Sequence, residues 1–356
     1  MDVLFFNLTY VKGHKYYDEK MIDNLLKVSN LYVLCPRNWY RRESSGATYI
    51  FNGKELSLSK ATTLGILKNG ISNCKAAVRY IKTNHIDVII IGKHDYFSMS
   101  VARFLLPGTI PIFLIQHNEI DQLNVMGIKG KIKRFCFNIF KDRVIHCVLE
   151  EFVKDYLITE EGISDNRVCC WPHPIERDFI ILNKERKYDC VGISTSNNEH
   201  IIMDIINTET KTENLKKHNR HIVLRSKTES FDNGHLKVFH GWIDDQEYEN
   251  YINNAKSVLI AFKEGYCNRV SASIFDAFSR HIPVLCTDMP LARFYNKKYG
   301  NICMIIDKDF VHTLNFIGKT SSDDESKFYE FYKDHNDETI QNIIKNDFQR
   351  LIRNII

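Results

Sequence analysis

The sequence contains no long apolar run. No stretch of its 356 residues approaches the roughly 20 consecutive apolar residues that a transmembrane helix needs. The apolar run Val3–Phe6 near the start is too short for a signal peptide, and residue 2 is acidic. We therefore expect a cytoplasmic protein, with any membrane contact being peripheral and on the inner face of the membrane.

Disulfide and metal-binding patterns are also missing. The ten cysteines include no Cys-x-x-Cys pair and do not reach the density of a disulfide scaffold, so we expect reduced thiols in the core. No Asp-x-Asp pair follows a strand predicted in the first half. The pairs His218/His221 and His235/His240 lack cysteine partners at zinc spacing. The sequence therefore predicts no metal site and no cofactor.

The chain has no strong excess of charge of either sign. A formal net charge of +4 does not demand a nucleic-acid partner, and we expect none. With 44% apolar and 26% charged residues, the composition is that of a soluble globular protein. The length is too great for one compact core and suits two domains.

Short apolar runs alternate with helix-length segments along the whole chain, and this alternation predicts an α/β fold with parallel sheets. In the first half we expect strands at Val3–Phe6, Leu31–Leu34, Val88–Ile91, Ile110–Ile115 and Val144–Leu149. In the second half we expect strands near Cys190–Ile193, His221–Leu224, Val238–Phe239, Val258–Ala261, Val284–Leu285 and Cys303–Ile306.

The domain boundary is predicted from Trp171-Pro-His-Pro174, whose prolines stop regular structure, and from the polar stretch Asn183–Lys187. These features divide the chain into an N-terminal domain at 1–178 and a C-terminal domain at 179–335. Residues 336–356 have apolar positions near a 3.6-residue period and are predicted to form a final helix.

One segment of the second half, Val258–Asp288, has the pattern of a phosphate-binding site. A buried strand leads through a polar loop to a helix that opens near Ser271, where free N–H groups and the helix dipole favour an anion. Small residues at 271, 272 and 273 would admit a diphosphate, Arg269 could clamp its oxygens, and Asp276 could accept from ribose hydroxyls. The alternative is that Ser271 is a plain N-cap and Asp276 a solvated helix residue.

Two stretches resemble the nucleotide-binding half of GT-B glycosyltransferases, above all the large retaining family of bacterial polysaccharide and glycolipid biosynthesis. They are Val238–Tyr248 and Arg269–Val284, the second ending in a His-Ile-Pro-Val turn. The resemblance implies two Rossmann-like domains facing a central cleft, with the C-terminal helix returning to the N-domain. It also implies metal-independent transfer of a sugar from a nucleotide-diphosphate donor, which we expect to be UDP- or GDP-linked.

The resemblance assigns roles to further residues. It places Arg269, Ser271, Ala272, Ser273, Asp276 and Gly241 at the donor. Ser194 follows the first strand of the C-domain, where relatives have cations that this sequence lacks, and Arg225 and Lys227 are the replacement charges. The family commonly has two acidic residues with seven residues between them, and Asp276 matches the second of them. The first, which contacts the transferred sugar in relatives, is Asn268 in this sequence, although Glu264 lies in the same loop.

Residues at the ends of the predicted N-domain strands are further candidates. His117 follows a strand at its carboxyl end, where α/β sheets place ligands, and the resemblance implies a position facing the donor sugar. Gly13 and His94 are expected at the acceptor or in the cleft. The alternatives are a structural hydrogen-bond role for His117 and an ordinary surface loop around His94.

The segment 127–143 combines six Lys or Arg residues with interleaved Ile and Phe. This pattern is typical of a basic amphipathic helix on an anionic membrane surface. An ordinary surface helix with one apolar core face gives the same pattern.

The expected activity is transfer of a glycosyl group to a hydroxyl of a saccharide or polyprenyl-linked saccharide in the synthesis of a cell-surface polysaccharide such as lipopolysaccharide or capsule. Two alternatives stay open. A catalytically inactive nucleotide-sugar or glycan-binding subunit would explain the missing first acid, and a nucleotide-sugar epimerase shares the fold.

Overall fold

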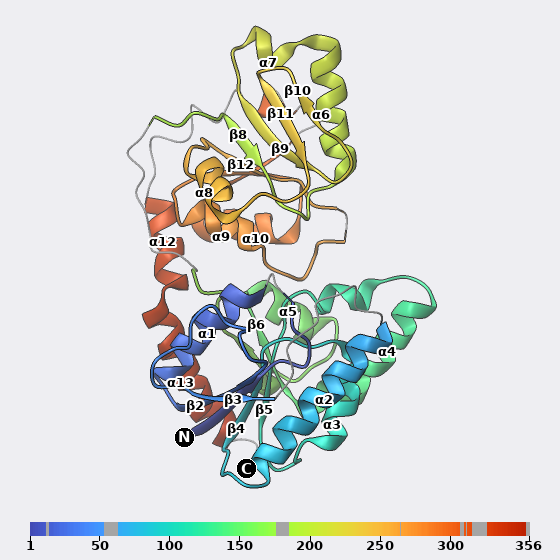
Figure 1. Ribbon diagram of the computed structural model, residues 1–356, viewed down its shortest axis with the longest axis vertical. Helices are drawn as coiled ribbons and strands as arrows, with labels where there is room; N and C mark the ends of the chain where they lie inside the picture. The colour runs from blue at the N-terminus through green and yellow to red at the C-terminus, as the bar shows by residue number, and fades with distance from the viewer. Residues whose placement is uncertain are drawn as a thin grey trace. The chain divides into compact units, whose positions relative to one another are not determined.

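The structure is a computed structural model that describes residues 1–11, 14–52, 63–175, 185–263, 265–306, 310, 312–314 and 326–353. The chain divides into two compact units. The first comprises Met1–Glu176, Asn268–Val270 and His335–Ile356, and the second comprises Arg177–Cys267 and Ser271–Asp334. Figure 1 shows each unit as a sheet covered by helices.

The sheet of the first unit has seven parallel strands in the order β3-β2-β1-β4-β5-β6-β7. Its central strands are continuous apolar runs because helices cover both faces. The strands are β1 (Asp2–Phe6), β2 (Asn30–Cys35), β3 (Thr48–Phe51), β4 (Val88–Ile91), β5 (Ile112–Ile115), β6 (Ile145–Val148) and β7 (Val168–Cys170).

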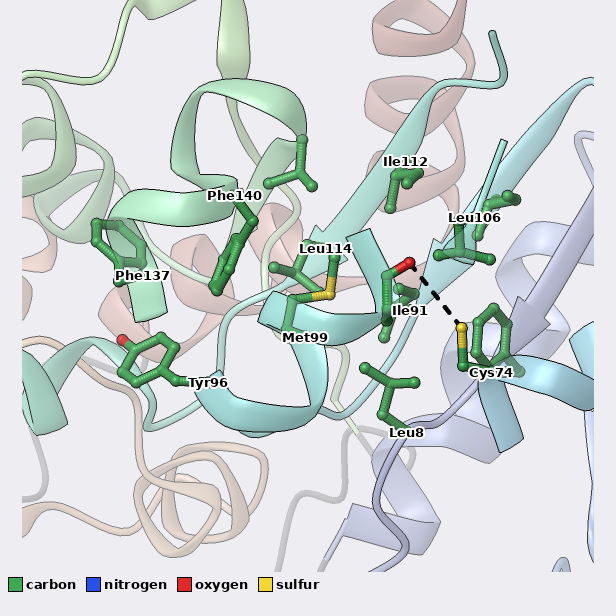
Figure 2. Packing of buried hydrophobic residues seen from close by; sticks show 14 of the residues in the cluster. Leu8, Cys74, Ile91, Tyr96, Met99, Leu106, Ile112, Leu114, Phe137 and Phe140 are labelled. Carbon is green, nitrogen blue, oxygen red and sulfur yellow. Dashed lines mark hydrogen bonds between the residues drawn. The ribbon is translucent and has the colours of Figure 1, made fainter. Parts of the chain in front are cut away.

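Alternate residues of these strands face two separate cores. Leu4, Phe6 and Ile91 join the core beneath α2 (Thr63–Ile81), α3 (Tyr96–Leu105), α4 (Ile128–Phe140) and α5 (Glu151–Thr159). In Figure 2, Met99 of α3 points toward Ile91 and Leu114, while Tyr96, Phe137 and Phe140 gather beside it. On the opposite face, Phe5 and Ile90 pack beneath α1 (Lys15–Leu26) and α13 (Asp337–Arg353).

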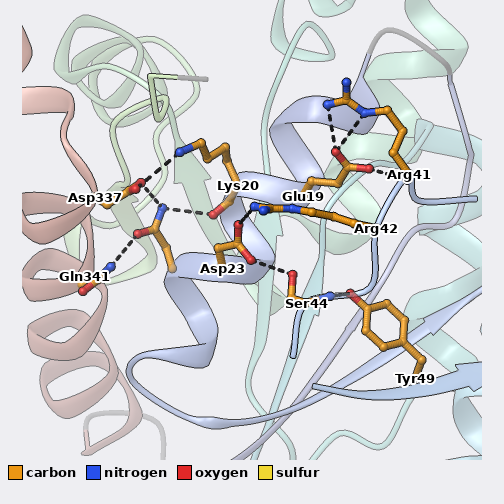
Figure 3. A network of polar contacts seen from close by, with 10 residues as sticks. Glu19, Lys20, Asp23, Arg41, Arg42, Ser44, Tyr49, Asp337 and Gln341 are labelled. Carbon is orange, nitrogen blue, oxygen red and sulfur yellow. Dashed lines mark hydrogen bonds and ion pairs between the residues drawn. The ribbon is translucent and has the colours of Figure 1, made fainter. Parts of the chain in front are cut away.

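A polar network fixes α1 from two sides (Figure 3). Asp337 accepts from Lys20 at 3.5 Å and from Asn24 at 2.9 Å, which joins the start of α13 to α1. On its other side, α1 offers Glu19 to Arg41 at 3.0 Å. The end of the chain is further held where Trp171 Nε1 donates to Asp347 at 3.0 Å. The last helix is therefore an integral part of the first unit.

The sheet of the second unit has the order β10-β11-β9-β8-β12-β13-β14, and only the short β10 runs antiparallel to its neighbour. Its strands are β8 (Cys190–Gly192), β9 (Ile222–Ser226), β10 (Phe231–Asp232), β11 (Leu236–His240), β12 (Val258–Ile260), β13 (Val284–Cys286) and β14 (Cys303–Ile305). Its helices are α6 (Glu199–Thr212), α7 (Asn214–Lys217), α8 (Asp245–Asn253), α9 (Ala272–Phe278), α10 (Pro290–Tyr299) and α12 (Ser326–His335).

The predicted α/β fold with parallel sheets is confirmed in both units. The expected strands are present, but the short strands β3, β7 and β10 and the helices α6, α7, α10 and α12 were not predicted. The amphipathic stretch Ile71–Asn84 is of helix length in the sequence, and the observed α2 begins eight residues before it, at Thr63. Among the residues that the structure describes, no helix combines the length and the apolar character needed to cross a membrane.

Candidate functional site

Parallel sheets bind ligands at the carboxyl ends of their strands, at the point where the strand order reverses. In the first unit this point lies where β1 neighbours β4, and in the second it lies where β8 neighbours β12. Most of the predicted site residues that the structure describes lie in loops or helix starts that follow such strand ends, whereas Arg225 is the penultimate residue of strand β9 and Asp276 lies within α9. The two edges are described in turn.

Asn197 organises the reversal point of the second unit. Its side chain is 2% exposed, donates to the carbonyl of Gly192 at 3.3 Å and accepts from the N–H of Ala261 at 2.9 Å. It thereby ties the loop after β8 to the loop after β12. Ser194, a predicted donor ligand, lies in the first of these loops and accepts from the N–H of Ser196 at 3.3 Å. Its hydroxyl shapes a turn at the edge of the sheet.

Lys227 does not project freely from the end of β9. Its ammonium donates to the carbonyl of Asn197 at 3.2 Å, and its backbone N–H donates to Glu199 at 3.0 Å. Glu199 also accepts from Ser226 and from Thr228. A carboxylate of the protein therefore already occupies the hydrogen-bond donors next to this lysine.

Arg225 and Trp242 form an exposed platform at the same edge. The guanidinium carbon lies 4.4 Å from the centre of the indole ring, and Trp242 is 84% exposed, whereas Trp39 and Trp171 are buried. Nε of Arg225 is buried and has no hydrogen-bond partner among the described residues. The preceding Gly241 has a φ of 102°, which favours glycine at this turn. A flat aromatic face beside a cation suits a planar, negatively charged ligand.

Helix α9 begins where the sequence predicts a helix start, at Ser271. Ser271 is the N-cap, is 4% exposed, and makes no side-chain capping bond to this fully described helix. Its carbonyl accepts from the N–H groups of Ile274 and Phe275. The N–H groups of Ala272 and Ser273 precede these intrahelical bonds and belong to the first turn, whose donors need partners outside the helix.

Asp276 is not a plain solvated helix residue. One carboxylate oxygen accepts from the Tyr248 hydroxyl at 2.8 Å, and the other lies 3.5 Å from Arg280. Arg280 is fully buried and also pairs with Glu249 at 2.9 Å. The Asp276 carboxylate is therefore held in a fixed orientation, about one helical turn after the start of α9.

In the first unit, Lys93 and Glu119 clamp the loops after β4 and β5. The Lys93 ammonium pairs with Glu119 and donates to Asn118 at 2.8 Å. Glu119 also accepts from the backbone N–H groups of His117 and Asn118 at 2.9 and 3.1 Å. Burial alone would raise the pKa of Glu119, but Lys93 outweighs it and lowers the pKa to about 2. Glu119 is therefore ionised at neutral pH, and its contacts fix the His117 loop.

His117 is buried at this edge and is electrically neutral. Its Nε2 lies 3.1 Å from the carbonyl of Gly92, and since a carbonyl only accepts, Nε2 carries the hydrogen and Nδ1 is left as an acceptor. Burial, assisted by His14 and Lys93, lowers the pKa of His117 well below its usual value. The rings of His14 and Tyr17 lie 4.3 and 4.5 Å away.

Two more groups of the first unit are buried with unused polar atoms. Asn7 donates to Asp18 at 2.6 Å, and burial raises the pKa of Asp18 to about 7. His94 is 2% exposed, and within the described ranges neither of its ring nitrogens has a hydrogen-bond partner. Burial lowers the pKa of His94 to about 4. The alternative of an ordinary surface loop around His94 is wrong, because the side chain is buried and lies between Tyr96 and Phe140.

Asn268 and Arg269 both contact Asp121 within the first unit. The backbone N–H of Asn268 donates to Asp121 at 2.6 Å, and Arg269 Nε lies 2.7 Å from the other carboxylate oxygen. The predicted phosphate clamp is thus paired with a protein carboxylate. The other two candidates, Gly13 and Glu264, lie outside the described residues.

Several of these residues were not predicted from the sequence. Trp242 lies inside the stretch that carries the family resemblance, but its high exposure, which marks it as a candidate ligand contact, cannot be read from the sequence. Asp18 and Asn7 meet only through the packing of α1 on β1, which spacing does not indicate. The one cluster of possible metal ligands in the described part of the chain is Asp2, His85 and Asp87. It lies at the amino ends of β1 and β4, away from the site.

Comparison of folds gives matches along the whole chain. An alpha-glucosyltransferase solved with UDP and a mismatched DNA 13-mer is 12% identical over 99% of both chains, with a TM-score of 0.59. A UDP-N-acetylglucosamine 2-epimerase from Rickettsia bellii is 12% identical over 100% of this chain and 98% of its own, with a TM-score of 0.60. Arabidopsis thaliana UGT89C1, solved with quercetin, is 11% identical over 99% of both chains, with a TM-score of 0.58.

No family model matches the sequence, and no curated protein matches it. At identities near 12% the likeness concerns the fold and not the chemistry. The bacterial polysaccharide family is therefore not established by these matches. Glycosyltransferases predominate among the structural neighbours, with an epimerase beside them. The chain has the GT-B fold.

Proposed function

We propose that this protein is a glycosyltransferase that moves a sugar from a nucleoside-diphosphate donor to a hydroxyl acceptor. The observation that carries the proposal is the end-to-end likeness to GT-B enzymes, one of which was solved with UDP. In the reaction the acceptor oxygen forms a bond to the anomeric carbon, the bond from that carbon to the diphosphate oxygen breaks, and the acceptor proton is released.

Donor recognition belongs to the second unit. Trp242 stacks on the base, and Arg225 neutralises charge beside it. The Ser271 hydroxyl and the first-turn N–H groups of Ala272 and Ser273 bind the diphosphate, as an unpaired helix start favours an anion. Asp276, held at 2.8 Å by Tyr248, accepts from the ribose hydroxyls. Gly241 and Ser194 shape the turns beside these groups.

Four charged or polar candidates have a less direct part. Lys227 already donates to the carbonyl of Asn197, so it supports the loop and adds positive potential near the diphosphate. Arg269 contacts the diphosphate when its bond to Asp121 is exchanged for a phosphate oxygen. Asn268 and Glu264 are the residues we assign to the transferred sugar. Lys227 and Arg269 stabilise the negative charge of the leaving diphosphate without a metal.

His117, which belongs to the first unit, is the residue that we assign to orienting the reacting sugar. Because its pKa is strongly lowered, the neutral imidazole is a weak base. Its Nδ1 can still accept a hydrogen bond from a sugar hydroxyl. The Lys93–Glu119 pair holds its loop in place. Gly13 and His94 are assigned to the acceptor side, and the acceptor class that we propose is a saccharide or polyprenyl-linked saccharide of a cell-surface polysaccharide.

The test is to titrate UDP and GDP into the full chain by calorimetry, and then to analyse the products formed from UDP- and GDP-sugars. Released nucleoside diphosphate together with a glycosylated acceptor supports transfer. Conversion of the donor into an isomeric nucleotide-sugar would instead identify an epimerase. Binding without turnover would identify an inactive sugar-nucleotide-binding subunit, and absence of nucleotide binding would remove the proposal altogether.

A further inference from the structure

The helix α4 has two apolar faces, and only one of them is used by the core. Cys136, Phe137 and Phe140 are buried against the first unit. Ile128, Ile132 and Phe135 recur at intervals of four and three residues and so form one stripe along a second, adjoining side of the helix. Ile128 is 78% exposed and Phe135 is 67% exposed.

The turn before α4 extends this stripe. Met126 is 91% exposed and Val125 is 45% exposed. The turn is held close to the helix, since a Cβ added at Gly130 would lie 1.7 Å from the carbonyl oxygen of Val125. Gly127 adopts a φ of 84° and its carbonyl accepts from the N–H of Lys131. The five apolar side chains from 125 to 135 therefore form one fixed surface, here called the α4 stripe.

The charged residues of α4 itself are all basic. Between Gln122 and Lys141 the sequence has five basic residues and no acidic one. Arg134 pairs with Glu161 at 2.8 Å, and Lys141 donates to the carbonyl of Glu161 at 2.9 Å. For Lys129, Lys131 and Lys133 the described part of the chain provides no acidic partner. At about 100° per residue, Lys129 and Lys131 lie on opposite sides of the stripe.

We propose that the α4 stripe docks on the surface of an anionic lipid bilayer. Exposed apolar side chains would enter the boundary between headgroups and acyl chains, while the flanking lysines pair with lipid phosphates. Exposed apolar surface of this kind marks a docking site for a protein or a membrane. A second copy of the chain is a poorer occupant, because its own stripe would bring lysines against lysines.

The experiment is flotation of the full chain with vesicles of phosphatidylcholine alone and of phosphatidylcholine mixed with phosphatidylglycerol. We expect binding to the mixed vesicles that weakens as salt is added. Lys129→Gln with Lys131→Gln should weaken binding roughly fivefold for each lysine, and Ile128→Ser with Phe135→Ser by about tenfold or more. The matched controls are Lys216→Gln with Lys217→Gln in α7, and Phe104→Ser, which removes a side chain that is 72% exposed at the far end of α3.

Three outcomes would overturn the proposal. The wild-type chain could fail to float with anionic vesicles at low salt, or the Ile128/Phe135 double variant could bind as well as wild type. Alternatively, sedimentation velocity could show a dimer that the same variant abolishes, without vesicle binding, which would assign the stripe to self-association. Because all four substituted side chains are at the surface, equal melting temperatures will show that folding is preserved.

Discussion

The Arg225 guanidinium lies 4.4 Å from the centre of the Trp242 ring, and this pair is presented at the carboxyl edge of the second sheet. If the pair receives a nucleobase, adding UDP or GDP should change the fluorescence of Trp242, which is 84% exposed. Trp242→Ala should remove the change and weaken nucleotide binding roughly tenfold, since stacking of a base on an aromatic ring contributes about 1–3 kcal/mol. Equal affinity of wild type and variant would exclude the base-stacking role.

The bond from Tyr248 to Asp276 leads to a second prediction. Tyr248→Phe removes the 2.8 Å hydrogen bond that orients the carboxylate and should weaken nucleotide binding by about threefold to tenfold, which is the net contribution of a typical hydrogen bond. Asp276→Asn should have the larger effect. Calorimetry with a 2′-deoxynucleotide is the control: if Asp276 meets the ribose, the variants should bind ribose and deoxyribose forms alike.

Substitutions of Arg269 and of Asp121 should change nucleotide affinity in opposite directions. If a diphosphate replaces Asp121 as the partner of Arg269, Arg269→Ala should weaken nucleotide binding by about tenfold, and Asp121→Asn should strengthen it a few-fold. Asparagine keeps an oxygen that can accept from the N–H of Asn268. A loss of affinity in both variants would show that the pair acts structurally and not at the phosphate.

Asp18 should make the protein less stable as the pH rises. Burial raises its folded pKa from 3.8 to about 7, so between these values the folded state binds more protons than the unfolded state. Its contribution is absent below about pH 4 and destabilises by up to roughly 4 kcal/mol at pH 8. Asp18→Asn should therefore raise the melting temperature at pH 8 relative to pH 5, whereas Asp155→Asn on the exposed side of α5 should not.

His94 should act in the opposite pH direction. Its folded pKa of about 4 lies below the ordinary 6.5, so its unfavourable contribution is absent above pH 6.5 and grows as the pH falls toward 4. Replacing it by Phe also removes two buried ring nitrogens that lack partners among the described residues. His94→Phe should stabilise by about 1–3 kcal/mol at pH 5. Denaturant titration measures this, with the exposed His200→Phe as the control.

The same variant separates two roles for His94. A histidine that only fills the core can be replaced by Phe without loss of activity. If His94 contacts the acceptor, the His94→Phe variant should have a lower kcat/KM than wild type although it is more stable. Unchanged stability together with unchanged activity would contradict both the burial argument and the acceptor assignment.

The sequence contained most of the fold because the central strands are buried on both faces. Runs such as Val88–Ile91 and Ile112–Ile115 need helices on either side, and that requirement predicts a parallel α/β sheet. The edge strand β3 was missed because all four of its residues are partly exposed or exposed, so its pattern is weak. The helix start at Ser271 was predicted within one residue, since the polar loop and the small residues mark it.

The site was predicted less completely because its geometry depends on contacts between distant residues. Asp276 and Tyr248 are 28 positions apart, and Arg269 and Asp121 are 148 positions apart. Spacing along one helix could place Asp276 below Ser273, but it could not indicate a hydroxyl arriving from α8. Likewise, the orphaned nitrogens of His94 arise only when α3 and α4 close over it.

The central claim is sugar transfer, and acceptor-dependent cleavage of the donor measures it most directly. The purified chain is incubated with UDP- and GDP-sugars, with and without a polyprenyl-linked saccharide, and the released nucleoside diphosphate is quantified for wild type and Asp276→Asn. We predict release that the acceptor stimulates and that the variant lowers by about tenfold or more. Release at the rate of a heat-treated sample, or equal release by both proteins, would contradict the account.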